Sequence, residues 1–277
     1  MKTWRLLKEA LSNWLLHEGP RMAAALSLYT LLSLAPLVIL TIAIAAAVFG
    51  RPAAQHALLY EVTGLMGSQG AAAVQTVIAH SQAPGARSWA TALGIATLIF
   101  GASSVFGELQ SALNKIWDAE VYRRSVLGIV KARLFSFAMV LAVGFISLVS
   151  LTVSAAATAL SSYYDDLLPQ RAPLIHAENV LVSLALVTVL IAVILKYVPD
   201  ARVGWRHVWS GAFATAVLFT IGKSLIGLYL GHTAVGSAYG AAGSLVVVII
   251  WVYYSAMIFY LGAEFTRLKA DPQRAPG

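Results

Sequence analysis

The stretch "MAAALSLYTLLSLAPLVILTIAIAAAVF", residues 22–49, decides the fold, because it contains no charged side chain. A helix needs about 20 predominantly apolar residues to cross the roughly 30 Å hydrocarbon core of a bilayer. The stretch is too long for the apolar part of a secretory signal peptide, and the polar segment before it, 4–21, is too long for the start of one. It therefore predicts a membrane-spanning helix that remains in the protein.

Five further apolar stretches follow, at roughly 89–112, 134–160, 178–198, 208–231 and 240–264. Each is continuous rather than alternating, which favours helices over the strands of a membrane barrel. Composition agrees, because 59% of the 277 residues are hydrophobic and only 11% are charged, against about 25% in a soluble domain. We therefore expect an all-α polytopic membrane protein with six transmembrane helices, forming a single membrane domain over residues 1–277.

The distribution of cations predicts an orientation for these spans. Loops and ends on one side of the bundle hold fifteen of the nineteen Lys and Arg residues, and the opposite loops hold only Arg51, Arg87 and Arg171. Cytoplasmic loops of membrane proteins are enriched in Lys and Arg. Both termini, including a tail at 265–277, are therefore expected in the cytoplasm. The same distribution explains the net charge of +7 without a nucleic-acid partner.

Two segments outside the spans are amphipathic. In the cytoplasmic segment 1–21, residues 3–16 carry apolar side chains at helical spacing, namely Trp4, Leu7, Leu11, Trp14 and Leu15. This pattern predicts a helix that lies on the membrane surface. Residues 53–81 predict one or two short amphipathic helices in the first outer loop, and packing against the bundle is the favoured interpretation for both segments.

Four stretches carry recognisable residue patterns: "AAALSLYTLLSLAPLVIL" (23–40), "GASSVFGELQSALNKIWD" (101–118), "YVPDARVGWRHVWSGAFATAVLF" (197–219) and "YGAAGSLVVVIIWVYYSAMIFYLGAEFTR" (239–267). In this order they resemble the YihY/BrkB family of bacterial inner-membrane proteins. The resemblance implies six helical spans in the bacterial cytoplasmic (inner) membrane. The family has been labelled ribonuclease BN and virulence factor, and roles in transport and envelope integrity are ascribed to it. The resemblance implies no active site that could be transferred to this chain.

The residues themselves argue against an enzyme. The six histidines lie at least 24 positions apart and form no HxH or HExxH motif, whereas a metal-dependent nuclease gathers His and carboxylate ligands around its ions. The chain has no cysteine, "GASSVFG" lacks the GxSxG spacing of a serine hydrolase, and no P-loop is present. We expect no catalytic residue, no metal, no cofactor and no ribonuclease activity.

One cation, Lys223, lies inside a predicted span, in "LFTIGKSLIGLYL" (218–230). A cation at a helix centre costs about 2.5–3.5 kcal/mol on insertion scales, so its ammonium should face the bundle or a wet cavity unless it extends to the headgroups. Pro36 falls at a similar depth in the first span and leaves the carbonyl of Leu32 without its usual donor. The predicted binding site comprises Lys223, Ser27, Thr30, Ser33 and Pro36. Close helix packing is the alternative explanation for the hydroxyl residues.

Polar residues near the cytoplasmic ends of the spans predict a gate or a proton-coupling site, formed by Glu108, Asn114 and Glu264. Arg133 and Arg206 are candidate partners for the carboxylates, and interfacial anchoring is the alternative. Trp251, Tyr253 and Tyr254 cross the middle of the sixth span, where they either line a cavity or simply pack.

Small residues at four-residue spacing predict where helices approach closely within the membrane. Gly227 and Gly231 form such a pair in the fifth span, and Ser103, Gly107 and Ser111 form a series in the second. Packing is the favoured interpretation, and sliding between two states is the alternative.

The favoured function is transport across the membrane, or flipping within it, of an anionic solute or anionic lipid, because the deep charge is positive. Membrane lipids are expected partners, and a homo-oligomer is compatible with the sequence. The alternative is a non-transporting scaffold for envelope integrity that recruits partners through its basic loops. The two differ at Lys223, since Lys223→Met should abolish transport and leave a scaffold indifferent.

Overall fold

The structure, a computed structural model, describes residues 2–81, 101, 104–119, 172–201, 203–232 and 242–270. All regular secondary structure in these ranges is helical, as the sequence predicts. The helices are α1 (Lys2–Leu16), α2 (Gly19–Phe49), α3 (Arg51–Ser81), α6 (Ala172–Tyr197), α7 (Trp205–His232) and α9 (Gly243–Ala270), and residues 104–116 form a further helix. The predicted third span, much of the second and residues 271–277 of the predicted tail lie outside the described residues.

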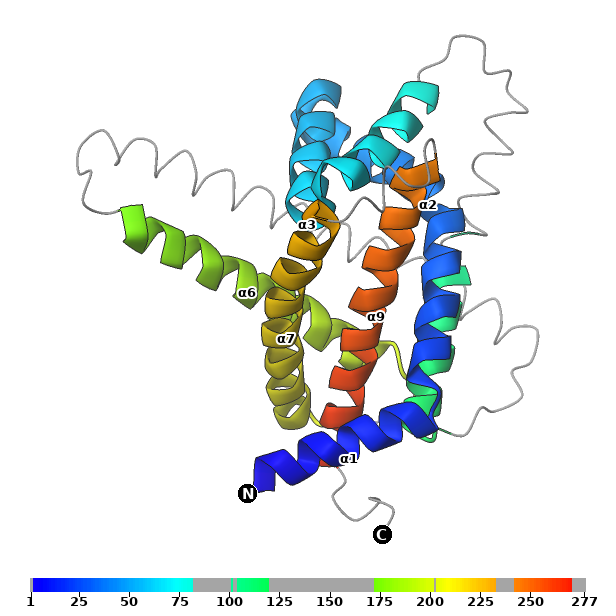
Figure 1. The fold of residues 1–277 in the computed structure, drawn as a ribbon, viewed down its shortest axis with the longest axis vertical. Helices are drawn as coiled ribbons and strands as arrows, with labels where there is room; N and C mark the ends of the chain where they lie inside the picture. Colours follow the sequence, from blue (N-terminus) through cyan, green and yellow to red (C-terminus); the bar gives the residue numbers. More distant parts are fainter. Residues whose placement is uncertain are drawn as a thin grey trace.

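α9 is the central helix of the bundle, with α2 on one side and α7 on the other (Figure 1). α6 packs against α7, and α3 packs against α2 at the end of the bundle opposite α1 (Figure 1). α1 lies across the other end, where it contacts α9. This end, which also contains the start of α2 and the C-terminal end of α9, is called the α1 end below.

Two of the described helices, α2 and α9, are long and apolar enough to cross a membrane, over Gly19–Ala47 and Gly243–Ala270. They coincide with the predicted first and sixth spans. Within α6, Ser183–Tyr197 is a shorter apolar helix, while α7 covers the predicted fifth span and includes Lys223. The count of six spans stays a prediction.

Residues with positive φ mark the turns between helices. Glu18 (φ 60°) turns the chain from α1 into α2, and Pro20 occupies the first turn of α2, where its fixed φ suits a helix start. Gly50 (φ 81°) ends α2 and donates its N–H to the carbonyl of Ala46. Gly67 (φ 72°) kinks α3 and divides it into two helices, so the predicted outer segment forms two rather than one.

α7 and α9 approach each other through two matched contacts. A Cβ atom added to Gly211 of α7 would lie 1.8 Å from the hydroxyl oxygen of Thr266, and one added to Gly262 of α9 would lie 1.9 Å from that of Thr215. Each threonine hydroxyl donates to the carbonyl of the glycine four residues earlier on its own helix, at 2.8 Å for Thr215 and 2.7 Å for Thr266. The two Gly-xxx-Thr segments thus bring the backbones together while keeping both hydroxyls satisfied.

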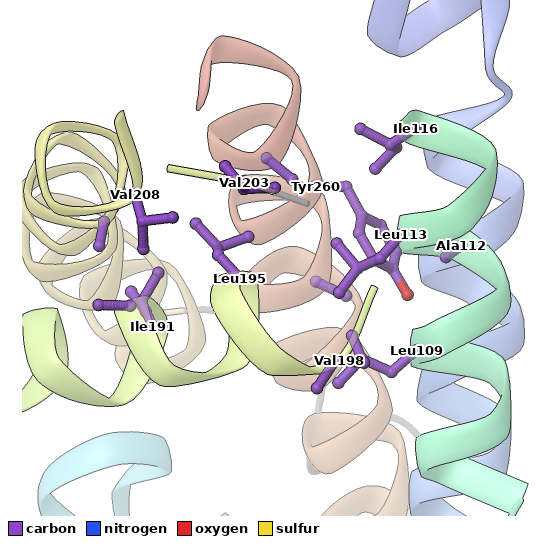
Figure 2. Packing of buried hydrophobic residues seen from close by; sticks show 14 of the residues in the cluster. Leu109, Ala112, Leu113, Ile116, Ile191, Leu195, Val198, Val203, Val208 and Tyr260 are labelled. Atoms are coloured by element: carbon purple, nitrogen blue, oxygen red, sulfur yellow. The ribbon is translucent and has the colours of Figure 1, made fainter. Parts of the chain in front are cut away.

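A hydrophobic core fills the α1 end of the bundle (Figure 2). Its most buried side chains come from residues 104–116, α6, α7 and α9, and include Leu113, Ile116, Leu195, Val208 and Tyr260. A second apolar cluster joins α2 to α3, through Val38, Ile42, Ala45, Ala54, Val62, Val74 and Ile78.

Candidate functional site

The structure separates Lys223 from the hydroxyl residues predicted beside it. Lys223 is half-buried on α7, whereas Ser27, Thr30 and Ser33 lie on α2, on the other side of α9 (Figure 1). Their hydroxyls donate to carbonyls of their own helix at 2.8, 2.8 and 2.6 Å. Within the described part of the chain, no carboxylate lies within ion-pair distance of the Lys223 ammonium.

Ser33 and Pro36 are buried in α2, which continues through the proline. A Cβ atom added to Gly101 would lie 3.0 Å from the Ser33 hydroxyl oxygen and 3.3 Å from the Ser33 Cα. Gly101 therefore approaches α2 closely at this point. This contact favours the packing interpretation of Ser33.

The three aromatic residues predicted to line a cavity all make packing contacts. The Trp251 ring meets that of Phe219 edge to face at 6.1 Å, and Tyr253 packs against the core at the α1 end. Tyr254 covers Gly222 of α7, where an added Cβ atom would lie 3.1 Å from the tyrosine hydroxyl oxygen. Packing between α7 and α9 accounts for Trp251 and Tyr254.

Glu264 belongs to a ring of four charged or ionisable side chains at the α1 end, which we call the buried charge ring after its two buried members, Glu264 and Arg267; Asp118 is exposed. The carboxylate of Glu264 is fully buried and shares a hydrogen bond with Nδ1 of His17. Arg267 lies 3.8 Å from the second oxygen of Glu264 and donates to Asp118. Asp118 closes the ring, with its carboxylate 3.9 Å from Nε2 of His17. The ring joins the α1–α2 junction to α9 and to the end of the helix at residues 104–116.

The partners of Glu264 differ from those suggested by the sequence. Arg206 is exposed in the first turn of α7, and Arg133 lies outside the described residues. His17 and Arg267 take their place because the turn at Glu18 and the last turns of α9 meet at the α1 end. His17 was missed, since its position 247 residues from Glu264 leaves no local signal.

Asn114 makes two hydrogen bonds with Asp200. Its side-chain amide donates to the carboxylate of Asp200 at 2.8 Å, and its carbonyl oxygen accepts from the Asp200 backbone N–H at 2.8 Å. Gln110, one turn earlier, also donates to Asp200 at 3.3 Å. These bonds tie residues 104–116 to the segment between α6 and α7.

A cavity of about 220 Å³ lies between the start of α2 and residues 104–116; its lining is Arg21, Met22, Ala25, Glu108, Ser111, Ala112 and Lys115. Glu18 bridges the two cations, with one carboxylate oxygen 2.5 Å from both Lys115 Nζ and an Arg21 guanidinium nitrogen. Hydrogen bonds from Lys115 and then Arg21 hold the pKa of Glu18 below its ordinary value of 4.5. The sequence predicted Glu108 as a functional residue but missed Glu18, Arg21 and Lys115, which resemble ordinary interfacial charges.

The described helices, two of them long and apolar enough to cross a bilayer, define a helical membrane protein with a polar site at one end. The chain belongs to the family described as virulence factor BrkB, whose model matches residues 10–276.

Relatives in several bacteria support this membership. The chain is 24% identical over 274 residues to YfkH of Bacillus subtilis (strain 168), which is named as ribonuclease-like, with 98% of this chain and 97% of that protein covered. It is 31% identical over 179 residues to a UPF0761 membrane protein of Pseudomonas paraeruginosa, covering 62% of this chain and 41% of that protein. A UPF0761 membrane protein of Tolumonas auensis is 37% identical over 84 residues, covering 30% of this chain and 28% of its own length. No solved structure matches the chain.

Proposed function

We propose that this membrane protein is a transporter or flippase in the bacterial cytoplasmic membrane, for a solute or lipid that carries an anionic group. The α1 end would face the cytoplasm, as the distribution of cations predicts. The observation that carries the proposal is the cavity at this end, which Arg21 and Lys115 line with cationic side chains. Cations near the headgroup level of a membrane attract phosphates and carboxylates.

Glu18 is the carboxylate that an anionic cargo would replace on the two cations of this cavity. Its carboxylate bridges Arg21 and Lys115. A phosphate monoester presents more acceptor oxygens and more negative charge than a carboxylate, and the phosphodiester of a lipid matches the carboxylate in charge and in free oxygens. Either group can therefore exchange with Glu18 on both cations. Lys223 on α7 is proposed as the cation that receives the anionic group deeper in the bundle.

Reconstituted proteoliposomes test this function with phosphatidylglycerol labelled on an acyl chain, whose movement between leaflets is followed by quenching from outside. The wild-type protein should accelerate the movement, and Arg21→Gln with Lys115→Gln should remove most of the acceleration. Arg206→Gln with Lys269→Gln removes two cations at the same end without touching the cavity lining, and should leave the rate unchanged. A labelled soluble phosphate ester trapped inside the vesicles tests the solute form of the proposal.

Lys223→Met separates the transporter from the scaffold. The variant should fold and insert normally, because no ion pair of the described residues is lost. Its transport rate should fall by about tenfold or more, the effect of losing one hydrogen bond to a charged group. Wild-type vesicles that move neither probe would instead support the non-transporting scaffold.

A further inference from the structure

The cavity between α2 and residues 104–116 contains charges of both signs. Arg21 and Lys115 contribute two cations, while Glu18, which bridges them, and Glu108 contribute two carboxylates. The formal charge of this group is therefore zero. A purely anionic ligand would reach the two cations by displacing Glu18, but it would then face the negative charge of Glu108.

Glu108 differs from Glu18 because no cation of the described residues lies within ion-pair distance of it. Its side chain is half-buried, and the next residue, Leu109, is buried in the core at the α1 end. Figure 2 shows Tyr260 extending from α9 toward residues 109–113. A carboxylate partly removed from water is stabilised by a cationic partner. The ligand that complements this cavity therefore carries a cation as well as an anion.

Three polar residues of the cavity lining lie at successive positions along the helix at residues 104–116. Glu108, Ser111 and Lys115 follow each other at three- and four-residue spacing, so they share one helix face. Lys115 is nearest the α1 end, and Glu108 lies about 10 Å deeper along the helix axis. A zwitterionic phospholipid carries its amine and its phosphate a few bonds apart. Its headgroup can therefore place the amine beside Glu108 and the phosphate beside Arg21 and Lys115 at the same time.

We propose that this cavity binds the headgroup of an aminophospholipid, with the primary ammonium on Glu108 and Ser111 and the phosphate on Arg21 and Lys115. The inference rests on the proposed function and narrows its cargo from any anionic group to a phosphate that carries an amine. A primary ammonium presents three N–H donors and a trimethylammonium presents none. The cavity therefore prefers the former.

Native mass spectrometry of the detergent-purified protein tests the preference directly, with equimolar phosphatidylethanolamine, phosphatidylglycerol and phosphatidylcholine of matched acyl chains. The wild-type protein should retain phosphatidylethanolamine over either other lipid by about tenfold, the order expected for one charge-assisted hydrogen bond. Glu108→Gln should remove this preference, and Glu108→Asp should keep much of it. Glu61→Gln, the same change on α3 away from the α1 end, should behave as the wild type.

The binding and transport measurements can reject the headgroup assignment and the transport function separately. Equal retention of phosphatidylethanolamine and phosphatidylglycerol by the wild-type protein, or an unchanged preference in Glu108→Gln, would overturn the headgroup assignment. Movement of labelled phosphatidylglycerol in vesicles would still support the proposed function in that case. The same vesicle measurement is repeated with phosphatidylethanolamine labelled on an acyl chain. Selective retention of phosphatidylethanolamine, with no movement of labelled phosphatidylethanolamine or labelled phosphatidylglycerol, would keep the assignment and overturn the transport function.

Discussion

Glu264 has one carboxylate oxygen bonded to His17 and a second oxygen without a hydrogen-bond donor among the described residues. The nearest cation to that second oxygen is Arg267, at 3.8 Å. Charges removed from water are costly, and they remain only where partners compensate them. The loss of His17 or Arg267 therefore leaves the buried carboxylate of Glu264 partly uncompensated.

Glu264→Ala should lower the free energy of unfolding by about 3–5 kcal/mol, the usual cost of removing one partner from a buried ion pair. Glu264→Gln should cost less, because an amide can still bond to His17. Unfolding in mixed micelles followed by far-UV circular dichroism measures both. Glu9→Ala, which breaks an exposed pair with Arg5 at 3.0 Å, is the control and should cost about 1 kcal/mol or less. Equal effects for Glu264→Ala and Glu9→Ala would contradict the role of the ring.

Glu18 makes a pH-dependent contribution because Lys115 and Arg21 lower the pKa of its carboxylate. A group with a depressed pKa stabilises the folded state above its ordinary pKa, here 4.5, and that contribution is lost as the pH falls through the folded-state value. Glu18→Gln should therefore be less stable than the wild type at neutral pH, and the difference should shrink below about pH 4.5. Thermal unfolding between pH 3 and 7 measures it. A difference that stays constant across this range would exclude the ionic origin.

At the scale of the helices, the boundaries followed from the sequence far better than the contacts between helices. The predicted spans 22–49 and 208–231 differ by only a few residues from α2 (Gly19–Phe49) and α7 (Trp205–His232), because long apolar runs determine helix length in a bilayer. α9 continues to Ala270, past the predicted end at residue 264, and its last turn carries Arg267 and Lys269. The Gly-xxx-Thr pairs were present in the sequence but went unnoticed beside Gly227 and Gly231.

The α7–α9 contact predicts that alanine at Gly262 destabilises the protein. Gly107 lies outside this contact and serves as the control, where alanine should have the opposite effect. Gly262→Ala should destabilise the protein by about 1–3 kcal/mol, because its Cβ atom meets Thr215. Gly107→Ala should stabilise it by about 0.5–1 kcal/mol, because alanine favours a helix and no described atom lies within 4 Å of its Cβ. Thermal unfolding in detergent compares the two. Thr215→Gly in the Gly262→Ala background should restore part of the loss, and a shift of the same sign at both glycines would refute the contact.

At the scale of the whole molecule, the candidate site shows where sequence reasoning ends. Glu108, Asn114 and Glu264 were identified because polar residues near the ends of apolar runs are conspicuous. Their partners were not, because the pairings join distant segments: Asn114 bonds to Asp200 across 86 positions, and Lys115 to Glu18 across 97. No helical period relates such residues. Depth alone also placed Lys223 beside α2, since a one-dimensional sequence cannot show that α9 lies between them.

The absence of cysteine from the chain allows a clean test of orientation. Ser12→Cys in α1 and Ser68→Cys in α3 are both at exposed positions, and the two helices lie at opposite ends of the bundle (Figure 1). Spheroplasts are cells whose outer membrane has been removed and whose cytoplasmic membrane is intact. In them, a membrane-impermeant maleimide should label Ser68→Cys, and it should reach Ser12→Cys only after lysis. Labelling of both variants in unlysed cells, or of Ser12→Cys alone, would contradict a cytoplasmic α1 end.

The paired glycines and threonines of α7 and α9 restrict the motions open to the bundle. If α7 slid or rotated against α9 by one residue, each threonine would leave its glycine and meet a bulkier side chain. The two helices should therefore move together as one rigid body. Any rocking that opens the protein alternately to either face must then hinge elsewhere. The interface of α2 with residues 104–116 is the expected hinge, because it contains the cavity and the exposed ion pair between Glu18 and Lys115.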